Sequence, residues 1–172
     1  IYTLKINVSL NIPENATEEQ MTALREQWKQ HGHYNETDNI VTETNKAKTN
    51  VDGDVKDTNQ VTTKVEGPEK TVSDSDETNV KKNTVRSLAD DWTYSITQKI
   101  AKNADEKYAS FAFKDSIEQC MKINSVKVKA DNGKDVTSWF DVSTVGNEVK
   151  ATLKNPGSND EFYKNNSYTM EI

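Results

Sequence analysis

Cysteine and long apolar runs are what this sequence most lacks. Cys120 is the single cysteine, so an internal disulfide framework is excluded. No run approaches the ~18 consecutive apolar residues of a membrane-spanning helix, so we expect no membrane partner. The residues around Cys120, from Ser116 to Ile123, are partly apolar, and they predict a buried, inert thiol.

Positive charge is also scarce. Lysine and arginine total 22 against 28 acidic residues, which gives a net charge of −6. Since no dense basic cluster is present, we expect no nucleic-acid partner. Hydrophobic residues make up only 33% of the chain, which suits strands that bury one face. The remainder, rich in Asn, Thr, Asp, Lys and Ser, is typical of polar, exported β-proteins.

Metal-binding patterns are weak. His31 and His33 flank Gly32 in a predicted loop, and a metal site needs more ligands in fixed geometry. The stretch Asp131–Lys134 resembles a calcium loop superficially, but it lacks the distal glutamate, so it predicts a tight hairpin turn. We therefore expect no metal and no cofactor.

Alternation of apolar and polar residues is the main structural signal. Ile1–Leu10 predicts a half-buried strand, and Asp91–Ile100 predicts another with Trp92, Tyr94 and Ile96 pointing inward. The Asp52-Gly53 pair predicts a hairpin turn. Further extended segments are predicted at Ile40–Ala47, Val55–Val65, Tyr108–Asp115, Val126–Ala130, Val136–Val142, Val149–Leu153 and Tyr168–Ile172, with one helical turn at Ser116–Met121.

One segment carries helical spacing instead. Thr17 and Gln20 fit a capping box, and the helix should end near Gly32. Its apolar residues are Met21, Leu24 and Trp28, and we expect this stripe to pack on a sheet. The pattern as a whole predicts an all-β sandwich of two sheets with one inserted α-helix.

The two ends of the chain are similar. Tyr2-Thr-Leu-Lys-Ile6 and Tyr168-Thr-Met-Glu-Ile172 have the same pattern, which suggests tandem modules. No signal peptide precedes the first strand, so we expect an excised fragment. On this interpretation, residues 1–66 are the back half of one module and 67–172 the front half of the next. We expect the two halves together to form one compact, permuted sandwich.

Lys70 poses the main chemical question. Gly67-Pro68 breaks the chain, and the extended segment that follows places Lys70 in phase with Val72. Lys70 is therefore either a solvated lysine on a sheet edge or a lysine directed toward the core. A buried lysine must be neutral, paired or consumed chemically.

Several stretches, in this order, resemble the isopeptide-forming immunoglobulin-like modules of Gram-positive, cell-wall-anchored adhesins. The resemblance is to the stalk modules of enterococcal aggregation substance and to the carboxy-terminal domains of the streptococcal antigen I/II family. It leaves out the helix at Thr17–His31. The stretches that carry it are Pro68–Asp74, Trp92–Thr97, Phe111–Ile117, Ser125–Val128, Asp135–Val142, Phe162-Tyr163 with Ser167–Ile172, Thr44–Ala47 and Thr58–Val61.

The resemblance implies an immunoglobulin-like sandwich and one autocatalytic bond. In such modules a lysine of the first strand attacks the side-chain amide of a late-strand asparagine, a carboxyl group assists, and ammonia leaves. Carried over, Lys70 is the amine, Asn45 the amide and Asp115 the assisting acid. Asn59 or Asn50 is an alternative to Asn45, and Asp115 is alternatively a helix N-cap. Here the asparagine precedes the lysine, the reverse of the family's order.

Two classes of function follow from the resemblance. The first is an extracellular, non-enzymatic stalk or adhesion module that contacts neighbouring modules of the same surface protein. The second is a binding module for a host protein or polymer, with the helix as its recognition element. An enzyme with turnover is disfavoured because no paired acids stand out and both histidines lie in one loop.

Overall fold

The computed structural model describes residues 4–6, 8, 10–13, 16–37, 39–100 and 107–172. The chain divides into two compact units, Ile1–Glu66 and Gly67–Ile172. We call them the N-terminal and C-terminal units and describe each by itself. Strands in antiparallel sheets are the main secondary structure of the described residues, which include one α-helix, so the predicted fold class is confirmed.

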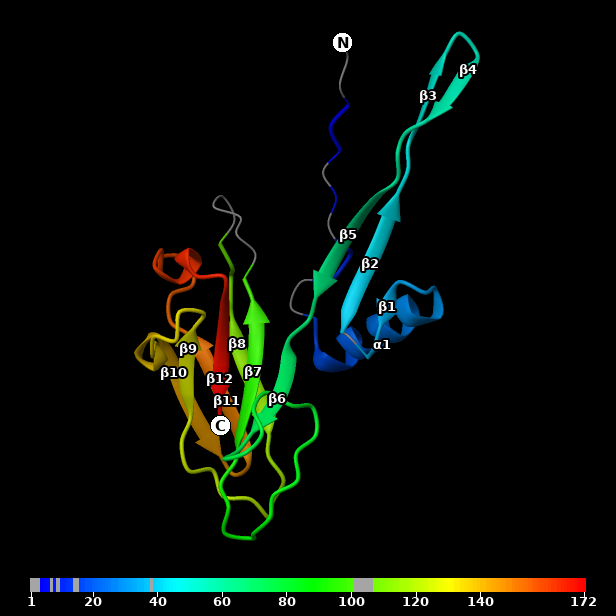
Figure 1. The fold of residues 1–172 in the computed structure, drawn as a ribbon. Coiled ribbons are helices and arrows are strands. Elements are labelled where there is room, and N and C mark those ends of the chain that lie inside the picture. The colour runs from blue at the N-terminus through cyan, green and yellow to red at the C-terminus, as the bar shows by residue number, and fades with distance from the viewer. Residues whose placement is uncertain (1–3, 7, 9, 14–15, 38, 101–106) are drawn as a thin grey trace. The chain divides into compact units, whose positions relative to one another are not determined.

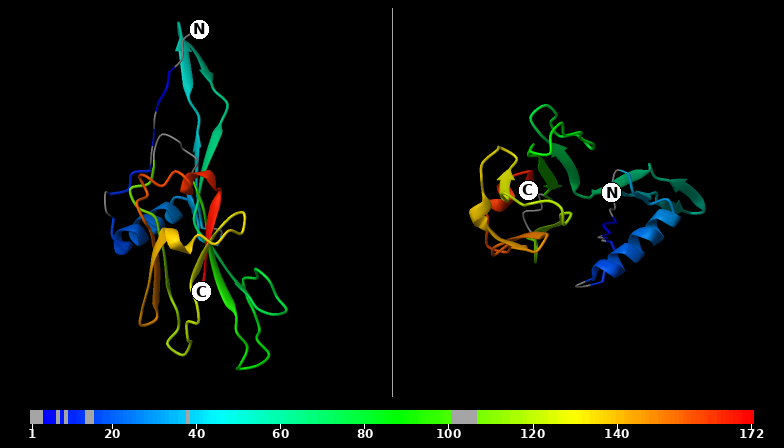
Figure 2. Two further views of the ribbon diagram at one scale, coloured as in Figure 1. Left: turned by 90° about the vertical axis from the view of Figure 1, so that its left-hand side faces the viewer. Right: turned by 90° about the horizontal axis from the view of Figure 1, so that it is seen from below.

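The N-terminal unit is a small sheet with one helix. Its strands β1 (Tyr34–Asn35), β2 (Ile40–Asn45) and β5 (Val61–Glu66) pair in the order β1-β2-β5. Strands β3 (Lys48–Val51) and β4 (Asp54–Asp57) form a hairpin that continues the ribbon of β2 and β5 away from the helix (Figure 1, Figure 2). Asp52 and Gly53 both have positive φ, 50° and 88°, as a type I′ turn requires. The predicted hairpin is confirmed.

The helix follows its sequence signals. Helix α1 runs Glu18–Gln30, and Thr17 and Gln20 form the reciprocal capping box. Met21, Leu24 and Trp28 are the half-buried residues of α1, and the helix contacts β1. The predicted capping and apolar stripe are therefore confirmed.

The first predicted strand is wrong within the described residues. Residues 4–6, 8 and 10 belong to no strand, and the side chains of Leu4, Ile6 and Val8 are exposed. An alternating pattern supplies an apolar face, but a strand also needs a neighbour to pair with. The remaining residues of the Ile1–Leu10 prediction lie outside the described part of the chain.

The C-terminal unit contains two antiparallel sheets. One has the order β6-β7-β12-β9, and its strands are Glu69–Ser73, Thr93–Lys99, Ser167–Glu171 and Lys127–Ala130 respectively. The other has the order β10-β11-β8, with strands Phe140–Val145, Glu148–Leu153 and Ala112–Ser116. Both sheets contribute inward side chains to one core, so they form a sandwich.

Aromatic side chains fill the centre of this core. Tyr168, Phe162 and Met170 are fully buried. The rings of Phe162 and Tyr168 stack with centroids 4.4 Å apart. The Tyr168 hydroxyl donates to the Phe162 carbonyl oxygen at 2.7 Å, so the one polar atom of that ring is satisfied. Phe162 belongs to a short 3₁₀ helix, η2 (Phe162–Lys164).

Three local predictions in the C-terminal unit are wrong. Ser116–Met121 contains no helix, because β8 extends through Ser116 and is followed by a turn in which the Met121 N–H donates to the Glu118 carbonyl. The predicted strand at 136–142 begins as the 3₁₀ helix η1 (Thr137–Trp139), because Asp135 accepts from the Thr137 N–H. Cys120 is exposed, since it lies in the turn after β8.

Candidate functional site

Lys70 lies on the inner face of an edge strand. It is directly opposite Ile96 in the β6–β7 ladder, and opposite residues share a face of the sheet. Ile96 is part of the core, so Lys70 starts from the core side, in phase with Val72. Because β6 is the end strand of its sheet, the long side chain reaches solvent, and 45% of it is exposed. Lys70 is therefore not buried.

Asp115 lies on the inner face of the opposite sheet. It is opposite Val149 in the β8–β11 ladder, and Val149 is fully buried. Strand β8 is also an end strand of its sheet. The Asp115 side chain is only 15% exposed. Its Oδ1 accepts from the N–H of the next residue, Ser116, and no helix follows, so the alternative role as a helix N-cap is wrong.

The two side chains meet across the gap between the sheets. The Lys70 Nζ lies 2.6 Å from the Asp115 Oδ2, a short charge-assisted hydrogen bond. The Nζ also lies 4.7 Å from the centre of the Tyr94 ring, within range of a cation–π interaction. An amine, a carboxyl group and an aromatic floor are thus gathered at the open edge of the sandwich.

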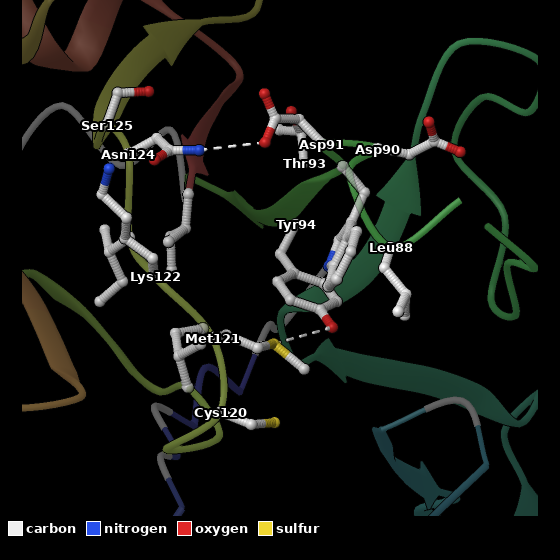
Figure 3. A pocket seen from close by; sticks show the side chains of 14 residues that line it. Leu88, Asp90, Asp91, Thr93, Tyr94, Cys120, Met121, Lys122, Asn124 and Ser125 are labelled. Atoms are coloured by element: carbon white, nitrogen blue, oxygen red, sulfur yellow. Dashed lines mark hydrogen bonds between the residues drawn. The ribbon is translucent and has the colours of Figure 1, made fainter. Parts of the chain in front are cut away.

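A cavity of about 590 Å³ adjoins this group. Tyr94 lines it, as does Ile117, which is two residues beyond Asp115. Figure 3 shows the Tyr94 hydroxyl directed at the Met121 sulfur, and the exposed Cys120 beside Met121. The lining also includes Leu88, Asp90, Asp91, Trp92, Thr93, Lys122, Ile123, Asn124, Ser125 and Ile172. This groove is lined by both apolar and polar side chains, and it meets the Lys70–Asp115 pair through Tyr94 and Ile117.

Asn45 belongs to the other unit. It is the last residue of β2, is exposed, and lies opposite Val61 of β5. The alternative Asn50 accepts through its side chain from the Gly53 N–H within the β3–β4 hairpin. Asn59 lies between β4 and β5 and donates to the Gln60 carbonyl. The structure thus brings Lys70 and Asp115 together, and it describes the asparagines only within their own unit.

The histidines make local contacts. The His31 Nδ1 lies 2.8 Å from the Gln27 carbonyl oxygen, and the His33 Nδ1 lies 3.2 Å from a Glu43 carboxylate oxygen. Within the described ranges, no group of three or more His, Cys, Asp or Glu side chains is arranged to hold a metal ion. Nor does any helix among the described residues have the length and apolar character needed to cross a membrane.

Sequence reasoning missed two components of the site. Tyr94 was predicted to point inward, but its position beneath the Lys70 amine depends on the β6–β7 register. The groove depends on the loop after β8, which the sequence predicted as a helical turn around a buried thiol. Neither feature follows from local periodicity, because both depend on which strands are neighbours.

Comparison with known proteins assigns the C-terminal unit. Residues 68–171, more than half of the chain, match the family described as cell surface antigen I/II C2 terminal domain. A comparison with curated proteins gives no match. The matched residues contain Lys70, Asp115, both sheets and all the residues that line the groove except Ile172. The chain therefore belongs to the antigen I/II C2 terminal domain family of cell-surface adhesins.

Proposed function

We propose that this chain is a structural stalk or adhesion module of a bacterial surface protein, stiffened by one isopeptide bond between Lys70 and Asn45. The observation that carries the proposal is the 2.6 Å contact between the Lys70 Nζ and Asp115 Oδ2 across the open edge of two sheets. Membership of a cell-surface adhesin family supports the setting. The module would act outside the cell, anchored to the wall as part of a larger protein, and contact neighbouring modules.

Stability alone gives a weak reason for the Lys70–Asp115 pair. The lysine is 45% exposed, and ion pairs of such exposure contribute about 0–1 kcal/mol. A reactive role gives a stronger reason to direct an amine and a carboxyl group into the same gap. The nearly buried carboxylate faces the gap itself, where an incoming strand would bring a third group.

The bond requires a strand that carries Asn45 to cover the gap in which Lys70 and Asp115 meet. Closure removes water from the amine and the carboxyl group, and loss of water favours the neutral form of each. Asp115 then accepts a proton from the Lys70 ammonium, and the free amine attacks the Asn45 side-chain carbonyl carbon. The protonated Asp115 polarises that carbonyl by a hydrogen bond.

The proposed reaction forms one covalent bond and breaks one. A bond forms between the Lys70 Nζ and the Asn45 Cγ, and the bond between Cγ and the amide nitrogen breaks. The second proton lost by the lysine amine passes through Asp115 to the leaving nitrogen, which departs as ammonia. No oxidant, metal or cofactor enters, and the reaction occurs once, so the module does not act as an enzyme with turnover.

Intact mass under denaturing conditions tests the bond. Each bond formed should lower the summed sequence mass by about 17 Da, because one ammonia leaves. Lys70→Ala, Asn45→Ala and Asp115→Ala should each keep the full mass. Lys114→Ala and Asn50→Ala are matched controls, since Lys114 pairs with Glu148 and Asn50 belongs to the hairpin turn. Full mass for the folded wild type would refute the bond.

A further inference from the structure

Trp92 lies outside the core of the C-terminal unit. Every other aromatic side chain that the structure describes in this unit belongs to the core or packs against it. Trp92 is half-buried, and it makes no hydrogen bond or ring contact with another described residue. A buried tryptophan usually finds a hydrogen-bond partner for its indole N–H. The core therefore does not explain why a tryptophan occupies this position.

Trp92 lies between two cavities. Together with Tyr94, it lines both the groove of about 590 Å³ and a second cavity of about 310 Å³. The other residues that line the second cavity are Val72, Lys81, Lys82, Asn83 and Val85. Volumes in this range are typical of pockets that hold a ligand. A ligand that packs on Trp92 can therefore extend into a cavity on either side.

The groove carries negative charge next to Trp92. Asp90 and Asp91 directly precede Trp92 in the chain, and both line the groove. The Asp91 carboxylate accepts a hydrogen bond from Asn124 at 3.2 Å (Figure 3). Both acids are exposed, and neither forms an ion pair with a described residue. Lys122 is the single cation among the lining residues, so the groove favours a cationic ligand.

The second cavity carries positive charge. Lys81 and Lys82 are exposed, and neither forms an ion pair with any residue that the structure describes. Val80 exchanges two backbone hydrogen bonds with Val72 of β6, and this pairing places the two lysines that follow beside the cavity. No acidic residue is among those that line it. The second cavity therefore favours a carboxylate.

We propose that Trp92 anchors a docking surface for a peptide segment of a partner protein. The segment carries an apolar residue against Trp92, a lysine or arginine in the groove, and an aspartate or glutamate in the second cavity. Leu88, which is fully exposed and also lines the groove, adds apolar contact. Tryptophan is a frequent hot spot of protein interfaces. Opposite charges on its two sides select a peptide, because nucleic acids and acidic polysaccharides carry charge of one sign.

A phage-displayed library of random linear peptides, selected on the full chain, tests this proposal. Peptides that bind the wild type but not Trp92→Ala should share an apolar residue flanked by one basic and one acidic residue. A labelled synthetic peptide of that sequence then gives the Kd by fluorescence anisotropy. Trp92→Ala should raise this Kd about 30-fold or more, which corresponds to the loss of a hot spot.

Charge variants test the same surface without changing Trp92. Asp90→Asn with Asp91→Asn should raise the Kd of the peptide about fivefold, and so should Lys81→Gln with Lys82→Gln. Asparagine keeps an oxygen for the hydrogen bonds that Asp90 and Asp91 accept. All four positions are exposed, so these variants should fold, which circular dichroism would check.

Two exposed residues that line neither cavity provide matched controls. Asp141→Asn and Lys127→Gln should leave the Kd unchanged. Selected peptides with no charge or one sign of charge, or a Kd that the charge variants do not alter, would overturn the proposal. Self-association of the wild type that Trp92→Ala abolishes would assign the surface to a second copy and overturn the partner protein. Peptide binding is measured separately from the mass of the proposed bond, so either can fail alone.

Discussion

Tyr168→Phe tests how the core of the C-terminal unit is held together. The substitution keeps the ring that stacks on Phe162 and removes only the hydroxyl. That hydroxyl donates to the Phe162 carbonyl oxygen at 2.7 Å and accepts from the Asn165 side-chain amide at 2.7 Å. Tyr168 and Phe162 are both fully buried, so solvent water cannot donate a hydrogen bond to the Phe162 carbonyl in place of the lost hydroxyl.

The structure sets the expected magnitude. An unsatisfied buried acceptor costs about 1–3 kcal/mol. The Phe162 carbonyl keeps one long bond of 3.4 Å from the Asn165 N–H, so the loss should fall in the lower half of that range, about 1–2 kcal/mol. For a domain of about 100 residues, each kcal/mol lowers Tm by about 4–8 °C.

Tyr94→Phe is the matched control for this experiment. Among the described residues, its hydroxyl hydrogen-bonds only with the Met121 sulfur, at 3.9 Å, and sulfur is a weak acceptor. Urea unfolding followed by tryptophan fluorescence should therefore show a change below about 0.5 kcal/mol for this control. Equal losses for the two variants would refute the argument that the buried carbonyl depends on the Tyr168 hydroxyl.

Alkaline unfolding should depend on the same hydroxyl. Burial is the largest cause that raises the pKa of Tyr168, to about 12. The unfolded chain releases this proton near pH 10, so the folded state holds the proton more tightly. The stabilising contribution is complete below about pH 10 and is lost as pH rises toward 12. Tyr168→Phe should lack this part of the pH dependence in a urea titration, and an unchanged profile would contradict the assignment.

Three further predictions concern single residues. Hydrogen bonds from the backbone N–H groups of Glu77 and Asp76 hold the pKa of Asp74 at about 2. The turn should therefore lose stability as pH falls from about 4 to 2. NMR titration of the Asp74 carboxyl carbon should show this lowered pKa. Thr17→Ala should weaken α1 by about 1 kcal/mol, seen as reduced helical circular dichroism, while Thr22→Ala, whose hydroxyl bonds within the helix, should not. Cys120 should react with a thiol reagent in the native protein as fast as in urea, because it is exposed.

Local signals in the sequence predicted most elements of the fold. The capping residues fixed the start of α1, and the Asp52-Gly53 pair fixed the β3–β4 hairpin. Alternation located β7, β9, β11 and β12 within one or two residues. Each of these features depends on contacts between residues close in sequence, which is why a single sequence reveals them.

Features that depend on neighbouring strands were harder to predict. The segment with Leu4, Ile6 and Val8 has the strongest alternation in the chain, yet its described residues pair with no strand. The phase of Lys70 was predictable from Val72, but its exposure was not, because exposure depends on β6 being an end strand. Cys120 has apolar neighbours in sequence, and only the course of the loop places it outside.

The candidate site was predictable in part for the same reason. The resemblance to the adhesin modules pointed to Lys70 and Asp115 as site residues. The two lie 45 residues apart in sequence. Their closeness depends on two ladders, β6–β7 and β8–β11, and on the packing of the two sheets. Periodicity gave the face of each strand but not the identity of the strand across the gap.

The most direct measurement of the central claim is the sequence of the cross-linked peptide. Wild-type protein, unfolded and digested with a protease that cuts outside 40–45 and 69–73, should yield one branched peptide that joins Lys70 to Asn45, with ammonia lost. Fragmentation in the mass spectrometer assigns both ends of the link. We expect this branched peptide from the wild type and none from Asp115→Ala. Recovery of an unmodified Lys70 peptide in full amount, or a link from Lys70 to Asn50 or Asn59, would contradict it.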